Sequence, residues 1–300
     1  MNKAYRKAKN GYRLLRSLIL PQKVFINSIF KKTHGYTLDF NNPQTLNEKI
    51  HWLKIYDRTP LHTLCADKFL ARNYIAEKVG TKYLVPLVFQ SKKPKDIRPE
   101  NLPDYPVIIK TNHDSGGIVV VKDKSKADWP QIRKHLRQKL RHNHFYRHRE
   151  WAYKNIERRI VVERFLIDEK KKFPDDIRVH CFNGKPGFIT IDSGRFETMK
   201  SGMYDLEWNY LDCQWTDPPA DRVEKPEMLD KVLELAGKLS ENFSYIRTDF
   251  YLVKNDIYVG ELTFYPCAGL KPFKPEKWDT IFGSMLQLPA KAKQKNFFFG

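Results

Sequence analysis

The sequence predicts an α+β fold in which antiparallel hairpins and helices build separate lobes. Residues 177–192 contain two apolar strands joined at Asn183-Gly184, a dipeptide typical of tight hairpin turns. Residues 244–264 repeat this pattern about a turn at 254–256. Because the strands of a hairpin run antiparallel, these two segments argue against a doubly wound parallel sheet.

Four segments have the residue spacing of helices. Thr45 and Glu48 are spaced as a capping box and open a helix over 45–56, whose apolar residues share one face. Gly80 is placed to end a second helix over 64–79. A very basic helical region covers 129–156, and a fourth helix starts at 226 with proline in its first turn.

Size and composition describe a globular chain. Its 300 residues, 41% of them hydrophobic, suffice for one large domain or for two to three packed lobes. No apolar run approaches the roughly 18–20 residues of a membrane span, and the basic N-terminus lacks the small-residue cleavage site of a secretion signal. The four cysteines lie far apart without metal-type spacing, which predicts reduced, buried thiols in a cytoplasmic protein.

The formal net charge of +19 predicts an anionic partner. No helix-turn-helix, zinc-finger or RNA-binding aromatic signature is present, so we expect no nucleic acid. The remaining candidates for the anionic partner are an anionic lipid and a phosphorylated or uronic-acid substrate. Segment 1–37 is basic and amphipathic, which predicts peripheral contact with the anionic inner face of the cytoplasmic membrane. The alternative is an ordinary helix packed on the body of the protein.

The hairpin over 244–264 carries charged side chains at regular positions. Arg247 and Asp249 are two residues apart and point to the same face, as do Glu261 and Thr263. Pairing about the turn gathers one cation, two carboxylates and a hydroxyl, an oxygen set that suits Mg²⁺ with a triphosphate as co-ligand. The alternative is a surface strand pair with alternating charges.

A lysine and a glycine loop follow an earlier strand. Lys110 ends the apolar run 107–110, and Gly116 and Gly117 lie in the next few residues. Glycines let backbone N–H groups approach phosphate oxygens while the lysine supplies positive charge. The order of residues differs from that of a P-loop, and an ordinary β-turn is the alternative.

Further polar residues lie on or near other predicted strands and helices. Glu163 closes an apolar strand that becomes a linker at Leu166, where backbone groups could meet an adenine edge. Asp168, just beyond, could hold a ribose hydroxyl. Lys68, in the predicted helix over 64–79, and Arg178, on the next strand, add cations.

Taken in chain order, these motifs resemble the TupA-like ATP-grasp family of bacterial surface-polysaccharide clusters. The resemblance spans roughly residues 38–288 and rests on 46–50, 66–68, 107–113, 115–117, 149–154, 181–184, 246–251, 260–264 and 273–275. It implies an ATP-grasp fold, in which two α+β lobes grip ATP behind a short N-terminal helical region. The implied division is a basic segment 1–37, a helical lead-in 38–66, a first lobe 67–165, a second lobe 166–288 and a tail 289–300.

The resemblance also implies roles for the nucleotide-site residues. Lys68 and Lys110 would clamp the α- and β-phosphates, and Gly116 and Gly117 would belong to the loop that closes over the triphosphate. The hinge residues 163–166 would meet adenine.

Asp168 would contact the ribose. Arg178 would sit where many relatives place a phosphate-binding lysine, which keeps the charge but changes the geometry.

The remaining roles concern metal and catalysis. Asp249 and Glu261 would bridge Mg²⁺ to the phosphates, with Thr263 standing where relatives often carry asparagine. Arg247 would steady the acyl-phosphate, assisted by Lys110 and Arg178.

The implied reaction is Mg²⁺-ATP-dependent ligation of a carboxylate with an amine through an acyl-phosphate. The expected substrates are a uronic acid of a surface polysaccharide, or of its lipid-linked precursor, and an amino compound. A glycosyltransferase of capsule or lipopolysaccharide biosynthesis is the first alternative, although no Asp-x-Asp motif is present. An ATP-dependent glycan kinase and a non-catalytic basic binding module are the others.

Overall fold

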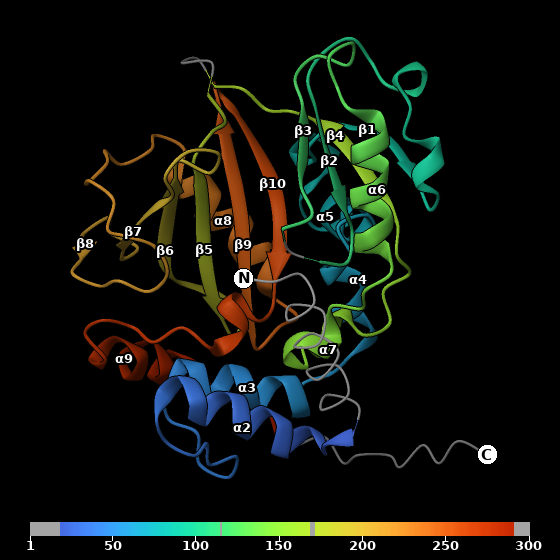
Figure 1. Ribbon diagram of the computed structural model, residues 1–300. Helices are drawn as coiled ribbons and strands as arrows, with labels where there is room; N and C mark the ends of the chain where they lie inside the picture. The colour runs from blue at the N-terminus through green and yellow to red at the C-terminus, as the bar shows by residue number, and fades with distance from the viewer. Residues whose placement is uncertain (1–18, 115, 169–171, 291–300) are drawn as a thin grey trace.

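Two antiparallel sheets lie beside each other in the computed structural model, which describes residues 19–114, 116–168 and 172–290 (Figure 1). The four-stranded sheet has the order β1 (Leu87–Ser91), β4 (Ile160–Arg164), β2 (Val107–Thr111) and β3 (Val119–Val121). The six-stranded sheet has the order β10 (Asp256–Thr263), β9 (Tyr245–Val253), β5 (Asp176–Phe182), β6 (Lys185–Ser193), β7 (Lys200–Tyr204) and β8 (Tyr210–Leu211). The α+β class and both predicted hairpins are confirmed.

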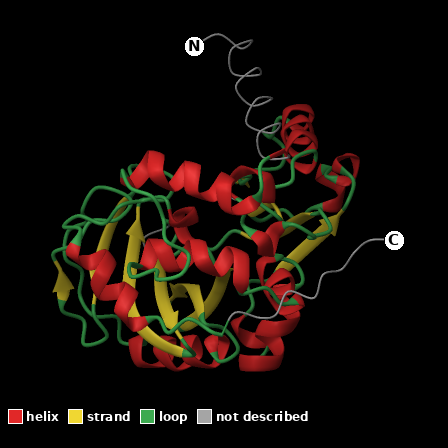
Figure 2. Ribbon diagram, turned by 90° about the horizontal axis from the view of Figure 1, so that it is seen from below, coloured by secondary structure: helices red, strands yellow, loops and turns green. Residues whose placement is uncertain are grey.

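The six-stranded sheet is apolar on one face and charged on the other. Helix α8 (Leu229–Ser240) packs on the apolar face, which includes Val179, Ile246 and Phe250. It begins at Leu229, three residues after the predicted start. Because successive side chains of a strand alternate, the charged residues of β5 and β9 share the opposite face. Figure 2, the view from below, shows helices on both sides of the strands.

Helix α3 (Leu46–Tyr56) begins as predicted, with the capping box of Thr45 and Glu48 formed. The predicted single helix over 64–79 is wrong. The chain instead forms α4 (Pro60–Ala66) and α5 (Ala71–Val79), because Asp67 Oδ1 accepts the backbone N–H groups of residues 69 and 70 and caps a turn between them.

The predicted helical region 129–156 is also divided. Helix α6 (Trp129–Leu140) covers the outer face of the four-stranded sheet, and the short α7 (Phe145–His148) follows (Figure 1). Arg149 adopts φ 56°, which ends α7. Single 3-10 turns occupy Thr81–Tyr83, Pro94–Asp96, Pro99–Asn101, Trp151–Tyr153 and Pro266–Gly269, and α9 (Lys277–Met285) is the last helix of the described chain.

Helix α2 (Gln22–His34) packs on the body of the protein, since its apolar side chains Phe25, Ile26 and Phe30 are buried in the core. This is the alternative expected for that part of segment 1–37. Membrane contact by the segment stays a prediction, and its first 18 residues lie outside the described chain, as do 291–300 of the predicted tail. The division of the chain at 37, 66, 165 and 288 also stays a prediction.

Two expectations from composition can be compared with the structure. None of the helices in the described ranges has the length and apolar character needed to cross a membrane. All four cysteines are free thiols, and three of them are buried as predicted, whereas Cys267 is partly exposed.

Candidate active site

A row of charged residues crosses three neighbouring strands of the six-stranded sheet. Arg178 on β5 pairs in register with Asp249 on β9, which pairs with Glu261 on β10. Arg247 and Thr263 are opposed in the next row. Because directly opposed strand residues point to the same side, all five side chains share one face. The predicted gathering of the hairpin residues is thereby confirmed.

Arg247 and Asp249 form a two-pronged ion pair. Arg247 Nε and Nη2 each lie 2.7 Å from an oxygen of Asp249, and Nη2 is 3.3 Å from Thr263 Oγ1. Arg178 Nε lies 3.6 Å from the same carboxylate. Burial would lower the pKa of Arg247, but the carboxylates of Asp249 and Glu261 outweigh it and raise that pKa. Arg247 is therefore a fixed positive charge on this face.

Lys68 connects the charged face to the glycine loop that follows β2. Its Nζ lies 3.0 Å from Glu261 Oε1 and donates to the backbone oxygen of Asp114 at 2.9 Å. Burial would raise the pKa of Glu261, but the charges of Lys68 and Arg247 outweigh it and lower that pKa to about 2. The Glu261 side chain keeps 31% of its exposure, so this carboxylate remains accessible.

Asn112, which sequence reasoning did not single out, holds the turn that carries Lys68. Its backbone oxygen accepts the Lys68 N–H at 3.1 Å, and its Nδ2 donates to Asp67 Oδ1 at 2.8 Å. Its Oδ1 accepts the N–H of Arg159 at 2.7 Å. This fully buried amide joins the end of β2 to the α4–α5 turn, and no charge pattern in the sequence marks it.

Lys110 and Glu163 pair within the four-stranded sheet. Lys110 Nζ lies 2.6 Å from Glu163 Oε2, while Arg72 Nη1 lies 3.4 Å from Oε1. The charge of Lys110 also lowers the pKa of Glu261. A pocket between the sheets is lined by Lys68, Arg72, Glu163 and Glu261. Glu163 thus lies inside β4, where its carboxylate orients Lys110.

The glycine loop after β2 is tightly folded. Thr111 Oγ1 donates to Asp114 Oδ1, and a Cβ atom at Gly117 would lie 2.7 Å from Thr111 Oγ1 and 3.0 Å from Asp114 Oδ1. Gly116 adopts φ +81°. A side chain at 117 would therefore force this loop to shift, while the approach of the loop backbone to phosphate stays a prediction.

The predicted hinge 163–166 is divided, since Glu163 and Arg164 belong to β4 and only residues 165 and 166 lie beyond it. Leu166 is buried. The neighbouring rings of Phe165, Phe173 and Phe196 contact one another with centroids 5.2–5.9 Å apart. The Asp168 carboxylate accepts the N–H of Lys172 at 2.7 Å, so its contact stabilises its own loop. Within the described residues, neither Leu166 nor Asp168 forms a hydrogen bond or an ion pair with the charged face.

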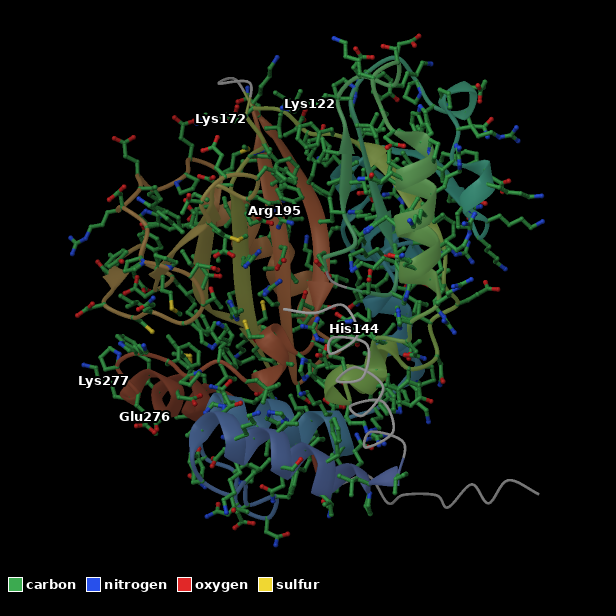
Figure 3. All side chains as sticks on the ribbon, in the orientation of Figure 1. Lys122, His144, Lys172, Arg195, Glu276 and Lys277 are labelled. Atoms are coloured by element: carbon green, nitrogen blue, oxygen red, sulfur yellow. The ribbon has the colours of Figure 1, made fainter. Side chains whose placement is uncertain are left out.

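Three further charged residues extend the charged face toward β6. Arg178 pairs with Asp192 and lies 3.9 Å from Asp176, and Arg195 forms a two-pronged pair with Asp176. Figure 3 shows Arg195 over the strands of this sheet. Sequence reasoning missed Asp176, Asp192 and Arg195. The spacing Asp176-x-Arg178, the mirror of Arg247-x-Asp249, was a usable signal.

The oxygen atoms of Asp249, Glu261 and Thr263 fit a hard cation such as Mg²⁺ in their chemistry. Glu261 is the accessible member, whereas both oxygens of Asp249 already accept from Arg247. Within residues 19–114, 116–168 and 172–290, no three His, Cys, Asp or Glu side chains are arranged as a metal site. Such an ion would therefore need phosphate oxygens or water to complete its coordination.

Comparison with known families identifies the class of protein to which these two sheets and their charged face belong, which is that of the ATP-grasp proteins. The family model for TupA-like ATP-grasp proteins matches residues 48–287. The chain belongs to the TupA-like ATP-grasp family. None of the curated proteins compared matches it.

Solved structures of ATP-grasp ligases are similar to parts of this chain. D-alanine–D-alanine ligase from Bacillus anthracis is 19% identical over 67% of this chain and 57% of its own, with a TM-score of 0.41. The Helicobacter pylori enzyme is 15% identical over 76% and 60%, also with a TM-score of 0.41. The ATP-grasp ligase PsnB with its minimal precursor is 13% identical over 68% and 53%, with a TM-score of 0.36. The chain thus spans less than two thirds of each relative.

Proposed function

We propose that this protein is a Mg²⁺-dependent ligase that uses ATP to join a carboxylate to an amine. The observation that carries the proposal is the row Arg178, Asp249 and Glu261 across three paired strands, which Lys68 reaches from the turn between α4 and α5. Cations and carboxylates so arranged suit phosphoryl transfer, where charge neutralisation is most of the catalytic task. Membership of the ATP-grasp family supports the same reaction class.

The proposed reaction has two halves. A carboxylate oxygen of the substrate attacks the γ-phosphorus of ATP, the bond to the bridging oxygen breaks, and ADP leaves. The amine nitrogen then attacks the acyl carbon, phosphate leaves with the bonding electrons, and the nitrogen loses a proton. The products are an amide, ADP and phosphate.

The residues of the site take separate parts in this reaction. Lys68 and Lys110 bind phosphate oxygens, and Arg247 neutralises the oxyanion that forms at the acyl carbon. Mg²⁺, held by Asp249 and Glu261, would supply additional neutralisation of phosphate charge. This reaction needs no nucleophilic side chain from the protein, because the substrates supply both nucleophiles.

We propose further that the carboxylate belongs to a uronic acid of a surface polysaccharide or of its lipid-linked precursor. The net charge of +19 supports a polyanionic substrate. Residues 129–149 contain no Asp or Glu and add a basic surface along α6. Such precursors would place the enzyme in the cytoplasm, in peripheral contact with the inner membrane face.

Thermal unfolding with and without Mg²⁺ tests the nucleotide site. We expect ATP with Mg²⁺ to raise the Tm, since a ligand at about 100 times its Kd adds about 2.7 kcal/mol. The same ligand should not stabilise Asp249→Asn. A shift with UDP-glucuronate or UDP-N-acetylglucosamine, but none with ATP, would instead support the glycosyltransferase alternative.

Hydroxylamine separates a ligase from a kinase, because it converts acyl-phosphates into hydroxamates. With ATP, Mg²⁺ and oligogalacturonate, the ligase proposal predicts a hydroxamate together with ADP. A kinase would release ADP and leave a phosphate ester that hydroxylamine does not cleave.

A further inference from the structure

Helix α3 has a buried polar face in addition to its apolar one. Asn47, His51 and Lys54 are each 0% exposed, and their spacing places them on one side of the helix. An ammonium group is costly to bury unless it is well bound. The groups that hydrogen-bond to this polar face therefore show which part of the protein the helix holds in place.

The partner nearest the site is the turn Pro266–Gly269, which follows β10. Cys267, Ala268 and Gly269 adopt φ values of 50°, 55° and 63°, so three successive residues are left-handed. For Cys267 and Ala268, which carry a Cβ atom, this conformation costs about 1–2 kcal/mol each. Such strain persists only where the surroundings hold it.

Side chains of α3 hold the carbonyl groups of this turn. Lys54 Nζ donates to Ala268 O at 2.7 Å, and His51 Nε2 lies 3.0 Å from Gly269 O. Lys54 Nζ is also 3.4 Å from His51 Nδ1. The ammonium can only donate, so His51 accepts at Nδ1 and donates from Nε2 to the turn.

Neutral groups bind the ammonium of Lys54. Besides Ala268 O and His51, it contacts the backbone oxygen of His148 at 3.3 Å. No carboxylate of the described chain forms an ion pair with it. Burial lowers the pKa of Lys54 to about 8 against the opposing charge of Glu150. Two backbone oxygens and an imidazole nitrogen are therefore the groups that bind this buried ammonium.

The turn lies beside the charged face. Burial raises the pKa of the Cys267 thiol, and the charges of Arg247, Arg178 and Lys271 oppose that rise. The turn also continues the strand of Glu261 and Thr263. The turn therefore lies near the charged face on the side of Arg247.

We propose that Lys54 and His51 are positioning residues that hold the turn 266–269 in its left-handed conformation against the charged face. The expected effect on turnover rests on the proposed function, whereas the effect on the turn does not. Lys54→Met removes the ammonium and keeps an unbranched side chain. Lys49→Met is the matched control, since Lys49 donates from the same helix to Gly283 O and Leu286 O, both at 2.8 Å.

Alkylation of Cys267 by iodoacetamide, followed by peptide mass spectrometry, reports on the turn itself. Cys267 is partly exposed, whereas Cys65, Cys181 and Cys213 are buried. We expect Lys54→Met to label at Cys267 about fivefold faster or more, because local opening sets the reactivity of a protected group. Lys49→Met should label at the wild-type rate, and the buried thiols should stay unlabelled in both variants.

Two alkylation results would overturn the proposal. One is an unchanged rate at Cys267 in Lys54→Met, and the other is an equal acceleration in both variants, which would mean general loosening. If the buried thiols of Lys54→Met react, the variant has unfolded. Lys54→Gln, which keeps a donor without the charge, then takes its place.

Hydroxamate formation supplies the second readout. We expect kcat to fall about tenfold or more in Lys54→Met, with KM for ATP within about twofold of wild type. A rise in KM for ATP equal to the fall in kcat would place the defect at the nucleotide and contradict the proposal. If ATP with Mg²⁺ does not stabilise even the wild-type protein, the ligase function fails, while alkylation still decides the role of Lys54.

Discussion

Lys68 and Glu261 form an ion pair of 3.0 Å that joins the turn before α5 to the edge strand of the six-stranded sheet. The proposed nucleotide phosphates and Mg²⁺ would each need one member of this pair. Binding of both would therefore exchange the direct contact for two new ones, lysine with phosphate and carboxylate with cation.

Lys68→Met should abolish most of the stabilisation by ATP and Mg²⁺. The loss of a charge-assisted contact to phosphate is worth about 1.5–3 kcal/mol, which weakens ATP by about tenfold or more. Isothermal titration with ATP and Mg²⁺ measures it. Lys78→Met, which removes a more exposed pair of 2.9 Å with Glu241, is the control. Equal affinities in the two variants would contradict the assignment of Lys68 to the nucleotide.

Glu261→Gln should change the pH dependence of folding stability. The pKa of Glu261 is about 2 in the folded protein against an ordinary value of 4.5. A lowered pKa stabilises the fold above pH 4.5, and this contribution is lost as the pH falls toward 2. The difference in Tm between wild type and variant should therefore shrink over that range. A constant difference would show that Lys68 and Arg247 do not hold the carboxylate ionised.

Asp249→Asn should destabilise the protein more than Glu261→Gln. Asp249 is 2% exposed and binds Arg247 through both oxygens, so its loss leaves a buried cation and costs about 3–5 kcal/mol. Glu261 is more accessible and leaves no two-pronged partner unpaired, so its replacement should cost less than that of Asp249. Urea unfolding measures both. Both variants should lose the Mg²⁺ dependence of ATP binding, and retention of it in Glu261→Gln would remove Glu261 from the metal site.

Gly117→Ala should disturb the glycine loop more than Gly116→Ala. The new Cβ at 117 would lie 2.7 Å from Thr111 Oγ1, so the loop must shift, at a cost of about 1–3 kcal/mol. At 116 no atom lies within 4 Å, and only the φ of +81° is unfavourable, at about 1–2 kcal/mol. We expect weaker ATP binding in Gly117→Ala. Equal binding by the two variants would show that the close packing at 117 does not shape the nucleotide site.

The hairpin residues of the site were predictable because a two-residue period and a short turn fix which side chains meet. Arg247, Asp249, Glu261 and Thr263 needed no knowledge of distant contacts. The contact of Lys68 with Glu261 spans most of the chain, and the sequence predicted a helix where Lys68 lies in a turn. A capping aspartate inside an otherwise helical pattern was the overlooked signal.

The polar face of α3 was harder to predict. Asn47, His51 and Lys54 have the same helical spacing as the apolar face of that helix, and polar residues at such spacing usually face solvent. Their burial depends on carbonyl groups more than 200 residues away, as in the pair of Lys54 with Ala268 at a separation of 214. No local pattern of residue types contains that information.

The contacts of α3 with residues 279–286 have a consequence for biosynthesis. Asn47 binds Asp279 across 232 residues, and Lys49 binds Leu286 across 237. On the ribosome, α3 emerges long before these partners, at a synthesis rate of about 5–20 residues per second. Lys54 and His51 can therefore reach their partners in the turn only after residues 266–269 have been synthesised.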